Sequence, residues 1–165
     1  MGVDADDFYE AISTFKGASK RLEKIAESTR SVAYKDFAHS PSKVKATTEA
    51  LKNQYPDREL LACLELHTYS SLNPDFLKEY KGALDAADKA VVFYSPHAVQ
   101  VKKLHPISEK QIAESFERED LLIFTDPAGF KDFLFDQNFE DTSLLLMSSG
   151  DYGGLDFNEL KKYIT

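Results

Sequence analysis

Residues with the chemistry to bind a ligand gather between Asp36 and Pro41, in the sequence Asp-Phe-Ala-His-Ser-Pro. An extended run ending at Tyr34 precedes this turn, and Ser40 followed by Pro41 is typical of a helix N-cap and a first helical residue. A strand end, a short polar loop and a helix N-terminus expose backbone N–H groups that can bind an anion. Residue types leave a second interpretation open, in which Asp36 and His39 only satisfy hydrogen bonds of the turn.

A second polar segment begins at His67, directly after the apolar residues 59–66. A histidine at the carboxyl end of a buried strand is well placed to hydrogen-bond a polar ligand. Ser70 and His67 could also form a nucleophile and base, but neither a Gly-x-Ser-x-Gly turn nor an orienting acid accompanies them. We therefore expect ligand binding here, with hydrolysis as the weaker alternative.

The third candidate segment is the loop after Met147, which contains Ser149, Gly150, Gly153 and Gly154. A glycine backbone can approach a ligand closely, although a tight turn without function explains these glycines equally well. The spacing is not that of a dinucleotide fingerprint, and the chain lacks the Gly-x-x-x-x-Gly-Lys-Ser/Thr pattern of a P-loop. This loop is therefore a weak candidate for a dinucleotide site.

Alternating strands and helices must position these three segments. Apolar runs predict strands over 22–27, 31–36, 59–66, 89–94, 121–124 and 144–147. Helical periodicity and cap residues predict helices over 4–14, 41–55, 108–118 and 156–163, one from 74 through 84, and one from 127. This order indicates an α/β fold with a Rossmann-like open, mostly parallel sheet and helices on both faces. In such a sheet the polar loops share the carboxyl edge, where ligands bind.

Composition excludes several classes of function. The 165 residues suit one domain with a real core, and the net charge of -8 argues against a nucleic-acid binder. No apolar run approaches the roughly 18 residues that a membrane span needs, and no signal peptide is recognisable. The single cysteine, Cys63, lies within an apolar run and is expected to be a buried, inert thiol. These features predict a cytoplasmic protein without membrane or nucleic-acid partners.

The densest basic cluster consists of Lys16, Lys20, Arg21 and Lys24. It could hold a nucleotide or a peptide carboxylate, although a solvated face is the favoured interpretation. Acidic residues between 4 and 10 have no matching ligand cluster elsewhere in the sequence. We therefore expect no metal site in this chain.

Three motifs together resemble the C-terminal domain of the Mur ligases, the ATP-dependent amide-bond ligases of peptidoglycan synthesis. The resemblance covers the chain from about Phe15 onward, in order and with compatible spacing. Ser40 departs from it, because family members usually have a second histidine there. The motifs are Phe15-x-Gly17-x-x-x-Arg21-Leu-Glu23, Asp36-Phe-Ala-His39-Ser-Pro41 and Glu65-Leu-His67-Thr-Tyr69-Ser70.

The resemblance implies a larger, three-domain enzyme. Residues 1–17 would be the lead-in from the central ATPase domain and residues 18–165 the C-terminal domain, so that the missing P-loop would belong to the central domain. In the implied reaction, ATP converts the muramoyl carboxylate of UDP-N-acetylmuramate into an acyl phosphate, and an amine displaces phosphate. ATP and Mg²⁺ would be bound mainly by the missing central domain, and this domain would be inactive by itself. The rival interpretation is a flavodoxin-like binding module without catalysis.

The resemblance also assigns roles to individual residues. Within the family, the Asp-Phe-Ala-His motif and residues 147–154 look most like the recycling member that attaches the tripeptide L-Ala-γ-D-Glu-meso-diaminopimelate. The member that attaches L-alanine is the alternative. No catalytic residue and no metal ligand is expected in this domain. By the resemblance, Arg21 and Asp36 would contact ATP, and the peptide pocket would be lined by His39, Ser40, His67, Tyr69, Ser70, Ser149, Gly150 and Gly153.

Overall fold

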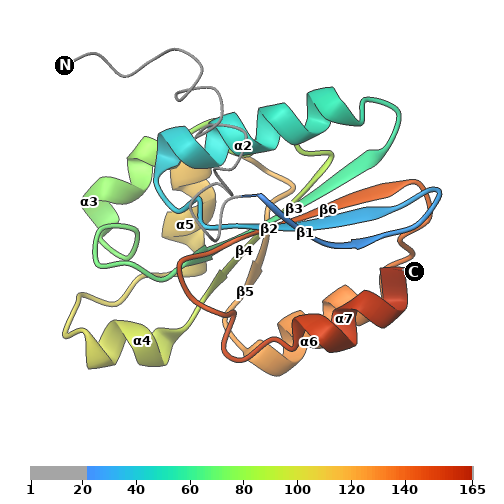
Figure 1. Ribbon diagram of the computed structural model, residues 1–165. Helices are drawn as coiled ribbons and strands as arrows, with labels where there is room; N and C mark the ends of the chain where they lie inside the picture. Colours follow the sequence, from blue (N-terminus) through green and yellow to red (C-terminus); the bar gives the residue numbers. More distant parts are fainter. Residues whose placement is uncertain (1–21, 165) are drawn as a thin grey trace, which may run out of the picture.

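The computed structural model describes residues 22–164, in which a single sheet lies between two layers of helices (Figure 1). Within these residues the six strands follow the order β1-β2-β6-β3-β4-β5 across the sheet. The strands are β1 (Glu23–Glu27), β2 (Val32–Asp36), β3 (Glu59–Leu66), β4 (Lys89–Tyr94), β5 (Leu122–Phe124) and β6 (Thr142–Met147).

All neighbouring strands from β2 to β5 run parallel, and only β1 pairs antiparallel with its neighbour among the described strands. The prediction of a mostly parallel, Rossmann-like sheet is therefore confirmed. The carboxyl ends of the five parallel strands lie at one edge, so the polar loops that follow them share that edge. Because β1 is antiparallel, it begins at this same edge, where Glu23 pairs with Lys35.

The helices begin where cap residues precede them. Asn73, Ser95, Ser108 and Asp126 each accept a backbone N–H in the first turn of a helix, and Ser108 forms a full capping box with Gln111. The helical segments are α2 (Pro41–Gln54), α3 (Pro74–Leu77), the 3-10 helix η1 (Lys78–Tyr80), α4 (Pro96–Val101), α5 (Glu109–Phe116), α6 (Pro127–Phe135) and α7 (Phe157–Ile164).

The sheet separates two hydrophobic cores. Helices α2, α3 and α5 pack on one face, and α6 and α7 cover the other (Figure 1). Strand β3 is buried on both faces from Leu60 onward, as its apolar sequence predicts. Cys63 is fully buried in this strand, and burial raises the pKa of its thiol, which makes it unreactive as expected.

Two local predictions are wrong in detail. The helix predicted from 74 through 84 ends at Leu77 and continues only as η1, and the chain then turns at Gly82 with a φ of 70°. A glycine adopts this left-handed conformation without strain, which favours a turn over a longer helix. Ser40 occupies the N-cap position of α2 as predicted, but its side chain makes no capping hydrogen bond.

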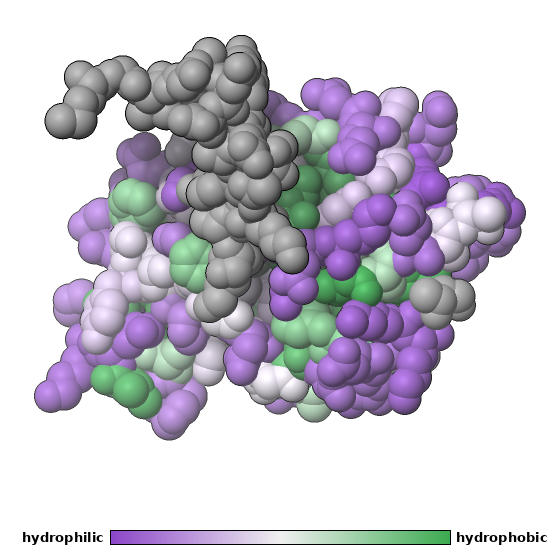
Figure 2. Space-filling model, in the orientation of Figure 1, coloured by the Kyte–Doolittle hydropathy of each residue, from purple (hydrophilic) through white to green (hydrophobic). Residues whose placement is uncertain are grey.

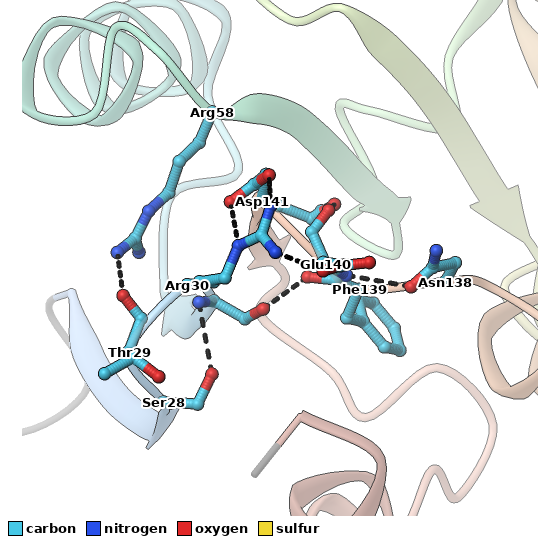
Figure 3. Close-up of polar contacts among 10 residues, drawn as sticks. Ser28, Thr29, Arg30, Arg58, Asn138, Phe139, Glu140 and Asp141 are labelled. Carbon is cyan, nitrogen blue, oxygen red and sulfur yellow. Dashed lines mark hydrogen bonds and ion pairs between the residues drawn. The ribbon is translucent and has the colours of Figure 1, made fainter.

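An ion-pair cluster closes the opposite, amino edge of the sheet (Figure 3). Arg30 precedes β2 and donates to both carboxylate oxygens of Asp141, with its Nε at 2.8 Å, and also to Glu140. The hydroxyl of the buried Ser31 donates to the carbonyl oxygen of Phe139 beside this cluster. These contacts hold the β1–β2 turn to the start of β6, away from the candidate ligand edge.

The outer surface of the described part is mostly polar on the face drawn in Figure 2. Hydrophilic residues cover α7, whose buried residues Leu160 and Ile164 point into the core. Hydrophobic residues show mainly between α2 and α7, where the edge of the sheet lies. None of the helices between residues 22 and 164 is long and apolar enough to cross a membrane.

Candidate functional site

The polar loops meet at the carboxyl end of β6. The loop after β6 leads to α7 on one face of the sheet, whereas the loops after β2 and β3 lead to α2 and α3 on the other face. β6 lies between β2 and β3, so connections of opposite direction diverge around its end. In open α/β sheets, this divergence opens the crevice in which ligands bind.

A cavity of about 120 Å³ lies at this point. Its lining includes Asp36, which the resemblance assigns to ATP, together with Ser149 and Gly150, which the resemblance assigns to the peptide. A site that encloses a whole drug-sized ligand usually measures at least ~300 Å³, so this cavity can hold only part of a nucleotide. It is lined by Lys35, Asp36, Phe37, Leu146, Ser148, Ser149, Gly150, Tyr152 and Phe157.

The carboxylate of Asp36 organises the turn after β2. Its Oδ2 accepts the N–H of Leu22 at 2.5 Å, and its Oδ1 accepts the N–H of Ala38 at 2.6 Å. The turn hydrogen bonds that the sequence left as an alternative are therefore present. Each carboxylate oxygen retains a further lone pair, so Asp36 can still accept hydroxyl protons of a ligand.

His39 is held in the same turn by two neighbouring residues. Its Nδ1 lies 2.8 Å from the carbonyl oxygen of Phe37, which can only accept, so Nδ1 carries the proton and Nε2 is left for a ligand. The hydroxyl of Tyr80 donates to the carbonyl oxygen of His39. Burial raises the pKa of Tyr80 to about 12, so this donor stays protonated at neutral pH.

Glu65 is a site residue to which the sequence analysis assigned no role. It is the last residue but one of β3 and is only 4% exposed. Its Oε2 accepts the Ser148 hydroxyl and the N–H of Tyr152, the latter at 2.9 Å. The Nδ1 of His67 lies 3.6 Å from Oε1. The signal in the sequence was a carboxylate inside an otherwise apolar strand, because a buried carboxylate requires partners.

The polar residues after β3 do not form a nucleophile–base pair. The Oγ of Ser70 lies 3.4 Å from the Oγ1 of Thr68, and no hydrogen bond joins Ser70 to His67 among the described residues. Tyr69 is 62% exposed, and the Nζ of Lys102 lies 4.5 Å from the centroid of its ring. The predicted alternative of a Ser70–His67 pair is therefore not formed in the described structure, and the role of this segment in ligand binding stays a prediction.

The glycines of the loop after β6 lie in two different pockets. Gly150 lies against Glu65 and His67, whereas Gly153 has a φ of 73° and lies against Pro127 at the start of α6. Gly153 thus lines a separate pocket of about 140 Å³ and is not brought together with the other predicted residues. The hydroxyl oxygen of Ser149 is buried at the cavity without a hydrogen-bond partner in the described part. Arg21 lies outside the described residues.

Comparison with known proteins finds similarity to enzymes named UDP-N-acetylmuramate–L-alanine ligase. No family model matches it. A UDP-N-acetylmuramate–L-alanine ligase of Caldanaerobacter subterraneus is 30% identical over 152 residues, which are 91% of this chain and 32% of the relative. The chain thus spans about a quarter to a third of the length of these curated relatives.

Two solved structures share the fold. A murein peptide ligase of Psychrobacter arcticus matches with a TM-score of 0.72 and 18% identity, over 99% of this chain and 34% of that one. A domain of a ligase for UDP-N-acetylmuramate and L-alanyl-γ-D-glutamyl-meso-diaminopimelate from Haemophilus ducreyi matches with a TM-score of 0.56 and 22% identity. This match covers 86% of this chain and 98% of that domain.

The described residues form a Rossmann-like α/β domain, and this fold matches that of a murein peptide ligase. The sequence is similar to part of the UDP-N-acetylmuramate–L-alanine ligases. The chain is therefore similar, in sequence and in fold, to one domain of the Mur ligases.

Proposed function

We propose that the chain is the C-terminal domain of an ATP-dependent ligase that joins an amine to the carboxyl group of UDP-N-acetylmuramate through an acyl phosphate. The cavity between the β2 turn and the β6 loop carries this proposal. It brings residues assigned to nucleotide and to amine together, yet at about 120 Å³ it is too small to enclose a nucleotide. Half of a cleft, completed by another domain, has these properties.

In this proposal the residues of the carboxyl edge divide by ligand. Arg21 and Asp36 contact ATP, because a guanidinium can bind phosphate bidentately and a carboxylate can accept ribose hydroxyls. The other domains bind Mg²⁺ and most of the ATP, so the domain is inactive by itself. The amine is bound by His39, Ser40, His67, Tyr69 and Ser70 with the loop residues Ser149, Gly150 and Gly153.

Two amines are candidates. The sequence motifs at Asp36–His39 and at 147–154 favour the tripeptide L-Ala-γ-D-Glu-meso-diaminopimelate, which would place the enzyme in peptidoglycan recycling. The names of the curated relatives, at about 30% identity, favour L-alanine. The described part of the rim offers His67, His39 and Lys102 as polar groups that could contact either amine.

An amine panel with the full-length protein tests the proposal. ATP, Mg²⁺ and UDP-N-acetylmuramate are supplied with L-alanine, the tripeptide or glycine, and phosphate release and UDP-linked product are measured. Product with the tripeptide or with L-alanine supports the ligase and identifies the amine. The same panel with the 165-residue chain should give no product. Binding of ligands without product by the full-length protein would instead favour the flavodoxin-like module.

The boundaries and location of the protein are part of the same proposal. Residues 1–17 would lead from the central domain and 18–165 would form this domain. A cytoplasmic location is proposed because ATP and a nucleotide-linked sugar are the expected substrates. Fractionation of cells that produce the full-length protein would test this location.

A further inference from the structure

The side chain of Glu65 makes hydrogen bonds with residues outside its own strand. It lies between Leu64 and Leu66 in β3 and is nearly as buried as these apolar neighbours. Its Oε2 accepts the hydroxyl of Ser148 and the N–H of Tyr152 at 2.9 Å. An apolar residue could occupy this position without any partner, whereas a buried carboxylate requires hydrogen bonds. The carboxylate therefore serves residues outside the strand.

One set of these residues is the loop after β6. The N–H of Gly150 donates to the Oγ of Ser148 at 2.6 Å, and the Ser148 hydroxyl donates onward to Glu65. A Cβ on Gly150 would lie 2.8 Å from Oε2 and 3.1 Å from the Cγ of His67. Loop, carboxylate and imidazole therefore pack against one another at a single point, so the position of one restricts the others.

The other residue that Glu65 serves is His67. Its side chain is 43% exposed, and its Nδ1 faces Oε1 of Glu65 at 3.6 Å. In a neutral imidazole, a carboxylate beside Nδ1 favours the proton on that nitrogen, and Nε2 then becomes an acceptor. Nε2 is the nitrogen that remains for a ligand at the rim.

We propose that Glu65 is a positioning residue that fixes His67 as a hydrogen-bond acceptor at Nε2. His67 then binds a donor of the incoming substrate, its amino group, and not a carboxylate, which offers only acceptors. The identity of the bound group rests on the proposed function. The protonation of Nδ1 is independent of that function, because it follows from the position of the Glu65 carboxylate beside His67.

Nitrogen NMR of the chain labelled with ¹⁵N-histidine tests the proposal directly. The chain has 4 histidines, so a His67→Gln variant assigns the His67 signals. The spectrum is recorded at mildly alkaline pH, where imidazoles are generally neutral. We expect the Nδ1–H tautomer for His67 in the unsubstituted protein. A predominant Nε2–H tautomer would overturn the proposal.

Two variants separate the charge from the loop contact. Glu65→Gln keeps an oxygen for the N–H of Tyr152 but places an amide N–H₂ near His67, so we expect a shift to the Nε2–H tautomer. Ser148→Ala removes one loop contact and keeps the carboxylate, so the tautomer should stay unchanged. If Glu65→Gln left the tautomer unchanged, the carboxylate would not determine it and the proposal would fail.

Kinetics of the full-length ligase supply the functional readout. Glu65→Gln should raise the KM for the amine roughly tenfold or more, as expected for a lost polar contact, and should leave the KM for ATP unchanged. An equal rise in both KM values would indicate a merely structural role and overturn the proposal. An unsubstituted protein with the Nδ1–H tautomer but no ligase activity would contradict the proposed function while supporting the role of Glu65.

Discussion

The hydroxyl of Tyr152 lies 2.8 Å from the carbonyl oxygen of Cys63, and thereby joins the loop after β6 to the centre of β3. The same hydroxyl lies 2.8 Å from the carbonyl oxygen of Met147, so it shares its proton between the two strands that flank the candidate site. Its ring stacks on Phe130 of α6 at 5.0 Å. The side chain of Tyr152 therefore fixes the loop after β6 to β3 and β6, while Glu65 binds the backbone N–H of the same residue.

Removal of this hydroxyl should destabilise the domain. Tyr152→Phe retains the aromatic packing and loses only the buried hydrogen bond, which contributes about 1–2 kcal/mol to the free energy of unfolding. Urea unfolding measures the difference. Tyr163→Phe is the matched control, because Tyr163 is 49% exposed and should change stability by less than about 0.5 kcal/mol. Equal stability of Tyr152→Phe and the unsubstituted chain would contradict the prediction.

Stability should fall in alkaline solution because of Tyr80. Burial raises its pKa from 10.0 to about 12 in the folded chain. The folded state therefore keeps the proton while the unfolded state releases it. This contribution is complete below pH 10 and is lost as pH rises from 10 to 12, by about 3 kcal/mol in all. Unfolding free energies at pH values on both sides of this window measure the loss.

Cys63 and Tyr152 also have raised pKa values and add to the alkaline loss, so a variant must isolate Tyr80. Tyr80→Phe removes the titrating hydroxyl and keeps the stacking on Phe116 at 5.3 Å. We expect a shallower fall of stability with pH for this variant. Parallel curves for the two proteins would show that Tyr80 does not titrate differently on folding.

Gly150 should tolerate no side chain. In Gly150→Ala the Cβ would overlap the carboxylate of Glu65, so either the loop or the carboxylate must move, at a cost of about 1–3 kcal/mol. In the full-length ligase the KM for the amine should rise as well. Gly129→Ala is the control, because the nearest atom to its Cβ, on Asp126, is 3.6 Å away. That variant lies in α6 and should gain about 0.5–1 kcal/mol.

Arg21 is expected to contact nucleotide phosphate. In the full-length ligase, Arg21→Ala should raise the KM for ATP about tenfold or more and leave the KM for the amine unchanged. Lys24→Ala is the matched control from the same basic cluster, because Lys24 pairs with Glu27 at 2.6 Å on the surface. If both variants raised the KM for ATP equally, general charge and not Arg21 would attract the nucleotide.

Local signals in the sequence predicted most of the elements. Ser108 and Asp126 cap their helices because a cap depends on residues only three positions apart, which a sequence displays directly. Buried β3 is recognisable because its apolar run contains almost no interruption. The helix beyond Leu77 was overestimated, because the apolar spacing of Tyr80 and Leu84 also suits η1 and the turn at Gly82.

The candidate site was only partly predictable. The parallel direction of the strands was enough to predict that Asp36 and Gly150 lie at the same edge of the sheet, and both line the cavity. The insertion of β6 between β2 and β3 is a long-range property that no local pattern encodes. Without that order, the contact of Glu65 with Ser148 could not be inferred, nor the separation of Gly153 from Gly150.

The antiparallel direction of β1 places its two ends at opposite edges of the sheet. β1 begins at the carboxyl edge, where the N–H of Leu22 contacts Asp36, and it ends at the amino edge, where the Arg30 cluster lies. A rotation of the proposed ligase domain about its carboxyl edge would therefore move Asp36 through a short arc and the Arg30 cluster through a long one. In the proposed ligase, the body of the domain could then reorient while the carboxylate of Asp36 stays close to its ligand.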